Sequence, residues 1–109
     1  MTRVTLLARG GREAGFELSG HATADAQDDE GGLVCAALSS AALMAANTIT
    51  EVLGEKAAID QRDGYLRVVL AHTSAEAVQI LRGFAFHIRA MADEHPGRIH
   101  IETEEIKNA

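Results

Sequence analysis

Two residues of this chain have side chains suited to covalent chemistry on an amide bond, a cysteine and a histidine. Cys35 is the chain's only cysteine, and His21 lies a short distance before it. When a thiol and an imidazole lie close together, the imidazole can take the thiol proton and later return one to the leaving amine. The pair therefore predicts a nucleophilic site in which Cys35 attacks and His21 moves the proton.

The expected position of Cys35 in the fold supplies a reason for its thiol to ionise. Cys35 follows Gly31 and Gly32 closely, at the start of a predicted helix. Unpaired N–H groups and the helix dipole stabilise negative charge there, on a thiolate and on the oxyanion formed when a carbonyl is attacked. We expect Gly31 and Gly32 to bind substrate, because glycine lets a substrate backbone approach closely.

Each of the two residues also has a simpler interpretation. Cysteines outside disulfides are among the most buried residues and commonly act as small hydrophobic side chains, and Cys35 lies in an apolar stretch. A histidine at the end of a strand is often exposed to solvent and without a chemical role. Spacing alone does not choose between the two interpretations.

The segment between the two residues is predicted to be a mobile loop. Residues 22–32 are polar and acidic and end in two glycines, a composition typical of loops. Because this loop leads from a strand to a helix, it can bring His21 and Cys35 close together.

Alternating apolar residues predict five strands. Gly10 and Gly11 form the turn of a first hairpin, and Asp63-Gly64 is a strong turn signal for a second, because both of its positions favour positive φ. The predicted strands are residues 3–9, 15–19, 57–62, 65–71 and 98–104.

Two apolar stripes at spacings of three and four residues predict helices. The first helix ends before Gly54, and the second begins at a capping box formed by Thr73 and Glu76 and ends at Pro96-Gly97. The stripes consist of Val34, Leu38, Ala41, Ala45, Ile49 and Val52 in the first helix, and of Ala77, Leu81, Phe84, Ile88 and Met91 in the second.

The predicted order of elements is β-β-α-β-β-α-β. This order indicates an α+β fold in which a mostly antiparallel sheet carries two helices on one face. A chain of 109 residues supports one hydrophobic core, so residues 1–109 are expected to form a single domain. Aromatic residues make up only 4% of the chain, and a core of small aliphatic side chains favours further burial in a homo-oligomer.

Composition argues against several classes of partner. The net charge of −6 leaves no basic surplus for direct nucleic-acid binding. The longest apolar run, residues 35–46, is too short for a membrane span. The other histidines lack the spacing of metal ligands, so no metal or cofactor is expected. No secretory signal is visible, and a single thiol fits a reducing cytoplasm.

The block around the histidine and the cysteine resembles the ribosomal-processing cysteine protease family, often called Prp. The resemblance lies in Gly20-His21-Ala22, then an acidic loop with glycines, then Val34-Cys35-Ala36 with Ser39 four residues after the cysteine. The predicted order of strands and helices also resembles that family's fold, so the resemblance spans most of the chain.

This resemblance implies a homodimeric cysteine endopeptidase that removes a short N-terminal extension from a large-subunit ribosomal protein. It implies that Cys35 is the nucleophile and His21 its general base and acid. Ser39, one helical turn after Cys35, is expected to line the substrate site, although its hydroxyl can instead bond back to the helix. Gly20 matches the family too, as a substrate-site residue or as a requirement of the turn.

One position departs from the family pattern. The family usually has an aspartate three residues before the cysteine, where this chain has Gly32. Asp25, Asp28 and Asp29 are alternative carboxylates for orienting His21, and the sequence does not select one. The alternative function is a non-catalytic interaction module, associated with the ribosome or another partner, that keeps the fold.

Overall fold

Glycines at positive φ close the first hairpin of the sheet. In the computed structural model, which describes residues 1–21 and 27–107, strand β1 (Thr2–Arg9) pairs antiparallel with β2 (Arg12–Ser19) across Gly10 and Gly11. These glycines have φ values of 62° and 76°. Strand β2 begins three residues before the predicted strand, because a two-residue turn lets the ladder continue to Arg12.

Helix α1 (Asp29–Asn47) begins earlier than the sequence suggested. Asp28 is its N-cap, with a carboxylate that accepts from the N–H of Gly31 at 3.1 Å. A capping aspartate and two acidic residues in the first turn favour a helix start, and this outweighs the low helix propensity of the glycine pair. The predicted loop is therefore wrong for residues 29–32, and residues 22–26 lie outside the described residues.

A π-helical segment, η1 (Thr48–Val52), follows α1 without a break. The wider turn, marked by the bond from the N–H of Leu53 to the carbonyl of Thr48, changes the phase of the helix. Ile49 is fully buried as predicted, whereas Val52 is 76% exposed although the stripe placed it in the core. Gly54, at φ 68°, ends the helix as predicted.

The second half of the chain repeats the arrangement of two strands and a helix. Strands β3 (Ala57–Arg62) and β4 (Tyr65–Leu70) form the predicted hairpin, and helix α2 (Ala75–Glu94) follows. The cap of α2 is Ser74, which accepts from the N–H of Ala77; the predicted cap one residue earlier was wrong. The whole predicted stripe of α2 is buried.

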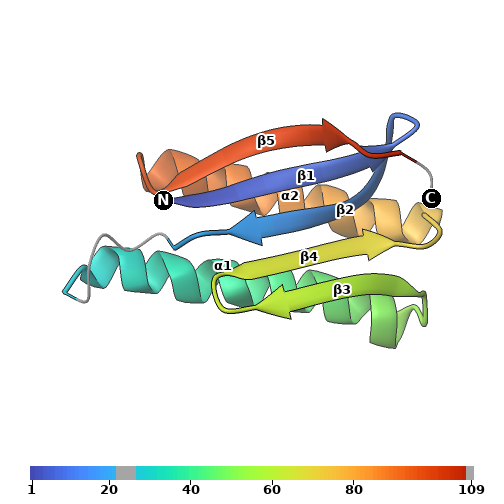
Figure 1. Cartoon of the computed structure of the whole chain (residues 1–109), viewed down its shortest axis with the longest axis horizontal. Helices are drawn as coiled ribbons and strands as arrows, with labels where there is room; N and C mark the ends of the chain where they lie inside the picture. The colour runs from blue at the N-terminus through green and yellow to red at the C-terminus, as the bar shows by residue number, and fades with distance from the viewer. Residues whose placement is uncertain (22–26, 108–109) are drawn as a thin grey trace.

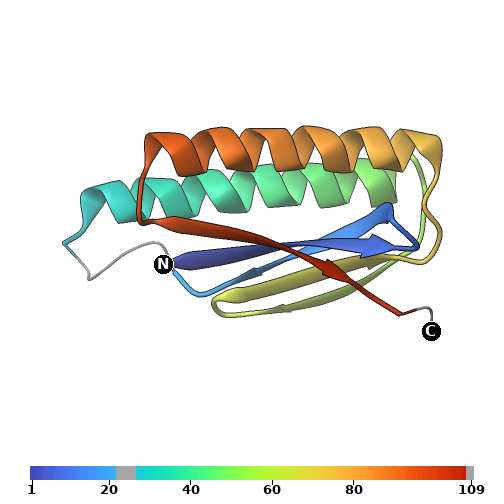
Figure 2. The same cartoon turned by 90° about the horizontal axis from the view of Figure 1, so that it is seen from above.

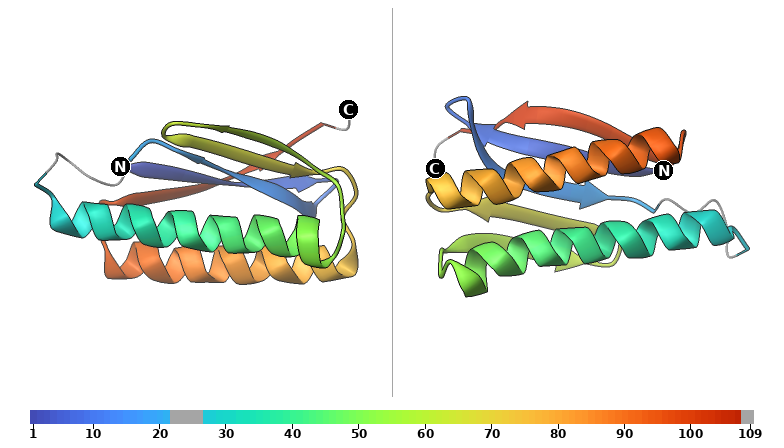
Figure 3. Two further views of the ribbon diagram at one scale, coloured as in Figure 1. Left: turned by 90° about the horizontal axis from the view of Figure 1, so that it is seen from below. Right: turned by 180° about the vertical axis from the view of Figure 1, so that it is seen from behind.

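The last strand, β5 (Ile99–Glu105), completes a five-stranded sheet of order β3-β4-β2-β1-β5. Among the strand pairs of the described residues, β1–β5 is parallel and the other three are antiparallel. Figure 2 shows both helices on one face of the sheet, and Figure 3 shows them from two further sides. Phe16 of β2 stacks on Phe84 of α2 with ring centroids 4.4 Å apart, which joins the two layers. The predicted α+β fold is confirmed.

The first helical segment is both long and apolar. By length and composition alone, Asp29–Val52 is long and apolar enough to cross a membrane. The helix extends beyond the apolar run of residues 35–46 at both ends. Its buried side chains, including Val34, Leu38 and Ile49, pack in the hydrophobic core, and this packing favours a core helix.

Candidate active site

The end of β2 positions His21. Gly20, the residue before it, has φ 84°, and a Cβ there would lie 2.8 Å from the carbonyl oxygen of Met1. Glycine is therefore required at position 20 both for its backbone conformation and for the close approach of the N-terminus. The imidazole of His21 projects from this turn and is exposed to solvent.

Cys35 lies in the second turn of α1, not at its start. It is half-buried and packs against the hydrophobic core. The expectation that first-turn N–H groups stabilise its thiolate was wrong, because the dipole effect falls off within the first turn. The N–H groups of Gly31 and Gly32 are also occupied, by the carboxylate and the carbonyl oxygen of Asp28.

A cavity of about 250 Å³ brings the candidate residues together. His21, Cys35, Gly20 and Ser39 all line it. Gly31 and Gly32 do not line this cavity; both belong to the first turn of α1, where Gly31 is buried and Gly32 exposed. In Figure 1 the end of β2, the β3–β4 turn and the first turns of α1 lie at the same end of the molecule.

Ser39 lies one helical turn after Cys35 and is exposed. Thr48 and Thr50, later in the same helical segment, donate their hydroxyl groups back to carbonyl oxygens one turn earlier. Among residues 1–21 and 27–107, Ser39 makes no such bond. Its hydroxyl is therefore available to a molecule in the cavity.

The β3–β4 turn forms the wall of the cavity opposite α1, a contribution that sequence reasoning missed. The lining residues from this hairpin are Gln61, Arg62, Asp63, Gly64, Tyr65 and Leu66. The Asp63-Gly64 signal identified the turn, but its nearness to His21 depends on the β2–β4 register, in which Ser19 lies opposite Tyr65. Local turn chemistry carries no information on that register.

The cavity lining combines apolar residues with polar ones, among them Arg62 and Asp63 of the hairpin turn. Of the apolar residues, Leu18, Leu38 and Ala42 are buried. On the sheet face away from the helices, Tyr65 donates its hydroxyl to the carboxylate of Glu17 at 2.6 Å, and this hydrogen bond raises the pKa of Tyr65 above its usual value. The arrangement suits a peptide that lies across the cavity with its backbone near Cys35 and His21.

Of the aspartates proposed to orient His21, Asp28 has other partners. Asp28 caps α1 and forms an ion pair with Arg98, and Asp29 lies in the first turn of α1. Asp25 lies outside the described residues. Asp63, which the sequence did not suggest, is an acidic residue that lines the same cavity as His21.

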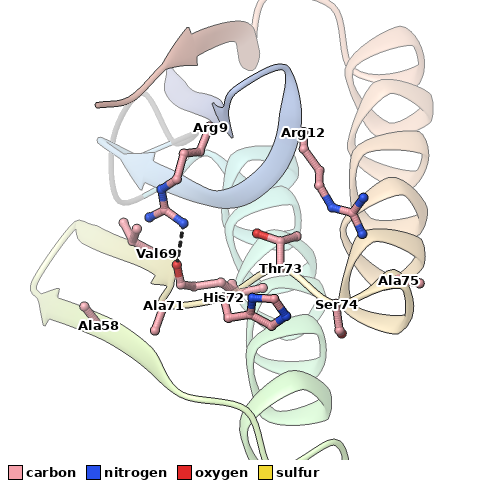
Figure 4. A pocket seen from close by; sticks show the side chains of 10 residues that line it. Arg9, Arg12, Ala58, Val69, Ala71, His72, Thr73, Ser74 and Ala75 are labelled. Atoms are coloured by element: carbon pink, nitrogen blue, oxygen red, sulfur yellow. Dashed lines mark hydrogen bonds between the residues drawn. The ribbon is translucent and has the colours of Figure 1, made fainter. Parts of the chain in front are cut away.

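A larger cavity, of about 920 Å³, lies at the opposite end of the sheet. Figure 4 shows Arg9, Arg12 and His72 around it, with the bond from Arg9 to the carbonyl oxygen of Leu70 at 3.1 Å. It contains neither Cys35 nor His21, so it is separate from the candidate site. Over the part of the chain that the structure describes, no group of three or more acidic, histidine or cysteine residues is arranged to hold a metal ion.

Comparisons with known proteins identify a matching family and similar folds. The family model described as cysteine protease Prp matches residues 1–100. The crystal structure of the ribosomal processing protease Prp from Staphylococcus aureus with a covalently linked product peptide is similar, with a TM-score of 0.83 and 21% identity. That match covers 95% of this chain and 100% of the other, and the same protein with a substrate peptide matches equally well.

A Streptococcus mutans protein also shares the fold, with a TM-score of 0.75 and 24% identity over 97% of this chain and 96% of the other. The search of curated proteins found no match.

Proposed function

The chain belongs to the Prp family of cysteine proteases, and from this membership we propose that it removes a short N-terminal extension from a large-subunit ribosomal protein. Cys35 is the nucleophile, and His21 is its general base and acid. The observation that carries the proposal is the cavity that both side chains line.

The reaction follows from the chemistry of a thiol–imidazole pair. His21 takes the thiol proton as the sulfur of Cys35 attacks the carbonyl carbon of the peptide bond. The C–N bond then breaks, the leaving amine receives the proton from His21, and the acyl group stays on sulfur as a thioester. Water, deprotonated by His21, hydrolyses the thioester and restores the thiol. The covalently linked product peptide of the S. aureus protein supports a covalent route.

The alternative function is an interaction module that keeps the fold but does not cleave. Two observations favour it: Gly32 replaces the usual aspartate of the family, and Cys35 lies outside the first turn of α1. Thiol reactivity separates the two functions, since only a thiolate reacts fast with iodoacetamide. In a protease, His21→Ala slows alkylation of Cys35 below neutral pH, whereas in a module the rate profile against pH is the same in both proteins.

Peptide cleavage tests the substrate. The probe is a synthetic peptide that spans the N-terminal extension and the first mature residues of the ribosomal protein from the same organism. Cys35→Ala abolishes cleavage, and His21→Ala lowers kcat about 10²–10⁴-fold. If alkylation of Cys35 depends on His21 but this peptide is not cleaved, the protease hypothesis stands and the ribosomal substrate is rejected.

We further propose a homodimer in the cytoplasm. The groove between α1 and α2, on the helical side of the molecule, exposes Met44, and its cavity of about 680 Å³ is lined mainly by small and apolar residues. A second copy of the chain would bury this surface. Further burial of this kind is favoured because the core contains few aromatic side chains. Sedimentation equilibrium tests the dimer, and Met44→Glu in this groove would shift it towards monomer.

A further inference from the structure

We propose that Gly64 is a positioning residue for His21. Because glycine has no Cβ, the imidazole of His21 can lie directly against the β3–β4 turn, and the turn sets the orientation of the ring. The inference rests on the proposed role of His21 as general base and acid. Gly64 contacts the base, so its effect on the reaction would pass through His21.

The contact involves one edge of the imidazole. A Cβ on Gly64 would lie 2.9 Å from Nε2 of His21, 3.4 Å from Cε1 and 3.6 Å from Cδ2. The first distance is too short for a contact between a carbon and a nitrogen atom, so either the backbone at position 64 or the imidazole would have to shift. Any side chain at position 64 would therefore displace the ring or the turn against which it lies.

The turn that makes this contact is itself fixed to the strand that carries His21. The carbonyl oxygen of Gly64 accepts from the N–H of Gly20 at 2.9 Å, which extends the β2–β4 ladder beyond the Ser19–Tyr65 pair. On the other side of the turn, the guanidinium of Arg62 lies 4.3 Å from the centroid of the Tyr65 ring.

This arrangement gives an exposed histidine a defined orientation. A histidine at a solvent-exposed strand end has several rotamers available, and only a ring that faces the thiol can move its proton. A rigid wall along the Nε2 edge restricts the ring before substrate arrives. A displacement of about 1 Å in such a group can lower the rate about 100-fold.

The test compares Gly64→Ala with Gly10→Ala. Both glycines lie in hairpin turns at positive φ, 70° and 62°, so both substitutions carry the same kind of backbone strain. A Cβ on Gly10 meets nothing within 4 Å. We expect Gly64→Ala to lower kcat about 10- to 100-fold with little change in KM, and to change the pH profile of Cys35 alkylation towards that of His21→Ala. Gly10→Ala should leave both unchanged.

A double variant separates failure of this inference from failure of the proposed function. If Gly64 acts through His21, Gly64→Ala has no further effect on alkylation in the His21→Ala protein. If His21→Ala slows alkylation but Gly64→Ala behaves like Gly10→Ala, or if the two effects add in the double variant, the inference is overturned and the dyad stands. If His21→Ala itself has no effect, the proposed function fails first.

A measurement on the unaltered protein covers the case in which Gly64→Ala does not fold. The geometry predicts a nuclear Overhauser effect between the Hα protons of Gly64 and the imidazole protons of His21. A folded protein whose imidazole protons show cross-peaks to other residues, but none to Gly64, would overturn the inference.

Discussion

The backbone N–H of Gly20 donates a hydrogen bond to the carbonyl oxygen of Gly64 at 2.9 Å. These glycines come from different hairpins, and both have positive φ. The bond therefore joins the residue before the candidate base to the turn that contacts its ring. It also shows that the geometry of the site depends on the pairing of β2 with β4, and not only on the segment between His21 and Cys35.

Gly20→Ala is expected to destabilise the fold by about 1–3 kcal/mol. The new Cβ would lie 2.8 Å from the carbonyl oxygen of Met1, at a backbone φ of 84° that alanine rarely adopts. Urea unfolding measures the change in the free energy of unfolding. Gly54→Ala is the control, since its φ of 68° carries similar strain and its Cβ would meet nothing within 4 Å. An equal loss in both variants would refute the role of the Met1 contact.

Most of the fold could be predicted from local patterns. The stripe of α2 and both hairpin turns depend on side-chain periodicity and turn chemistry, which the sequence displays directly. Val52 could not be placed correctly, because the π-helical segment adds a residue to the turn and rotates the last apolar position out of the core. That wider turn has no local sequence signature.

The change in helix phase at η1 leads to a stability prediction for two apolar residues of this segment, Ile49 and Val52. Ile49 is fully buried and Val52 is 76% exposed. We expect Ile49→Ala to cost about 2–5 kcal/mol of the free energy of unfolding, the range for large-to-small changes in a core. Val52→Ala should change it by less than about 0.5 kcal/mol. Urea unfolding of the two variants measures these changes. A loss above about 1 kcal/mol for Val52→Ala would contradict the exposed position that the π-helical turn gives to Val52.

The candidate site was only partly predictable. Residue types and the motif identified Cys35 and His21, and helical spacing added Ser39. The start of α1 was misplaced because Asp28 was assigned to a solvated loop, although its carboxylate caps the helix and pairs with Arg98. The wall formed by the β3–β4 turn depends on strand register between distant segments, which tertiary packing decides.

Ser39→Ala is expected to lower kcat/KM about 10-fold, the value of one hydrogen bond to substrate, without changing the thermal midpoint. Its hydroxyl lines the cavity of Cys35. Ser40→Ala is the matched control, because Ser40 lines the groove between α1 and α2 on another side of the helix. Equal kinetic constants for Ser39→Ala and the wild type would exclude a contact between this hydroxyl and the substrate.

A cluster at the start of α1 predicts acid sensitivity. Nδ1 of His95 lies 2.8 Å from the carboxylate of Glu30, and this hydrogen bond, aided by Arg98, lowers the pKa of Glu30 below its usual 4.5. A lowered pKa in the folded state stabilises the protein above pH 4.5, and this contribution is lost as the pH falls through the folded pKa.

Unfolding curves at several pH values test this cluster. Glu30→Gln should be less stable than the wild type near neutral pH, and the difference should disappear as the pH falls through the folded pKa of Glu30. Glu51→Gln, which removes a carboxylate from η1, controls for the change in net charge. A difference between Glu30→Gln and wild type that stays constant from neutral to acid pH would contradict the assignment.

Tyr65 reports on the pairing of β4 with β2 at the base of the β3–β4 turn. It is the chain's only tyrosine, and the chain has no tryptophan, so the ultraviolet absorbance of tyrosinate follows this one residue. Its hydroxyl donates to Glu17 at 2.6 Å, and this bond raises the pKa of Tyr65 above 10.0. A raised pKa in the folded state means that the bond stabilises the protein at lower pH and that this contribution is lost as the pH rises through the folded pKa.

The titration midpoint of Tyr65 should therefore lie above 10.0 in the folded protein and near 10.0 after unfolding in urea. Glu17→Gln should move the folded midpoint down towards the unfolded one, because the amide cannot repel tyrosinate as a carboxylate does. Glu13→Gln is the control on the same strand, since Glu13 pairs with Arg82 instead. Circular dichroism at each pH verifies that the fold persists. A folded midpoint equal to that of the unfolded chain would mean that the Tyr65–Glu17 bond does not form, and the base of the β3–β4 turn would then lack this side-chain link between β4 and β2.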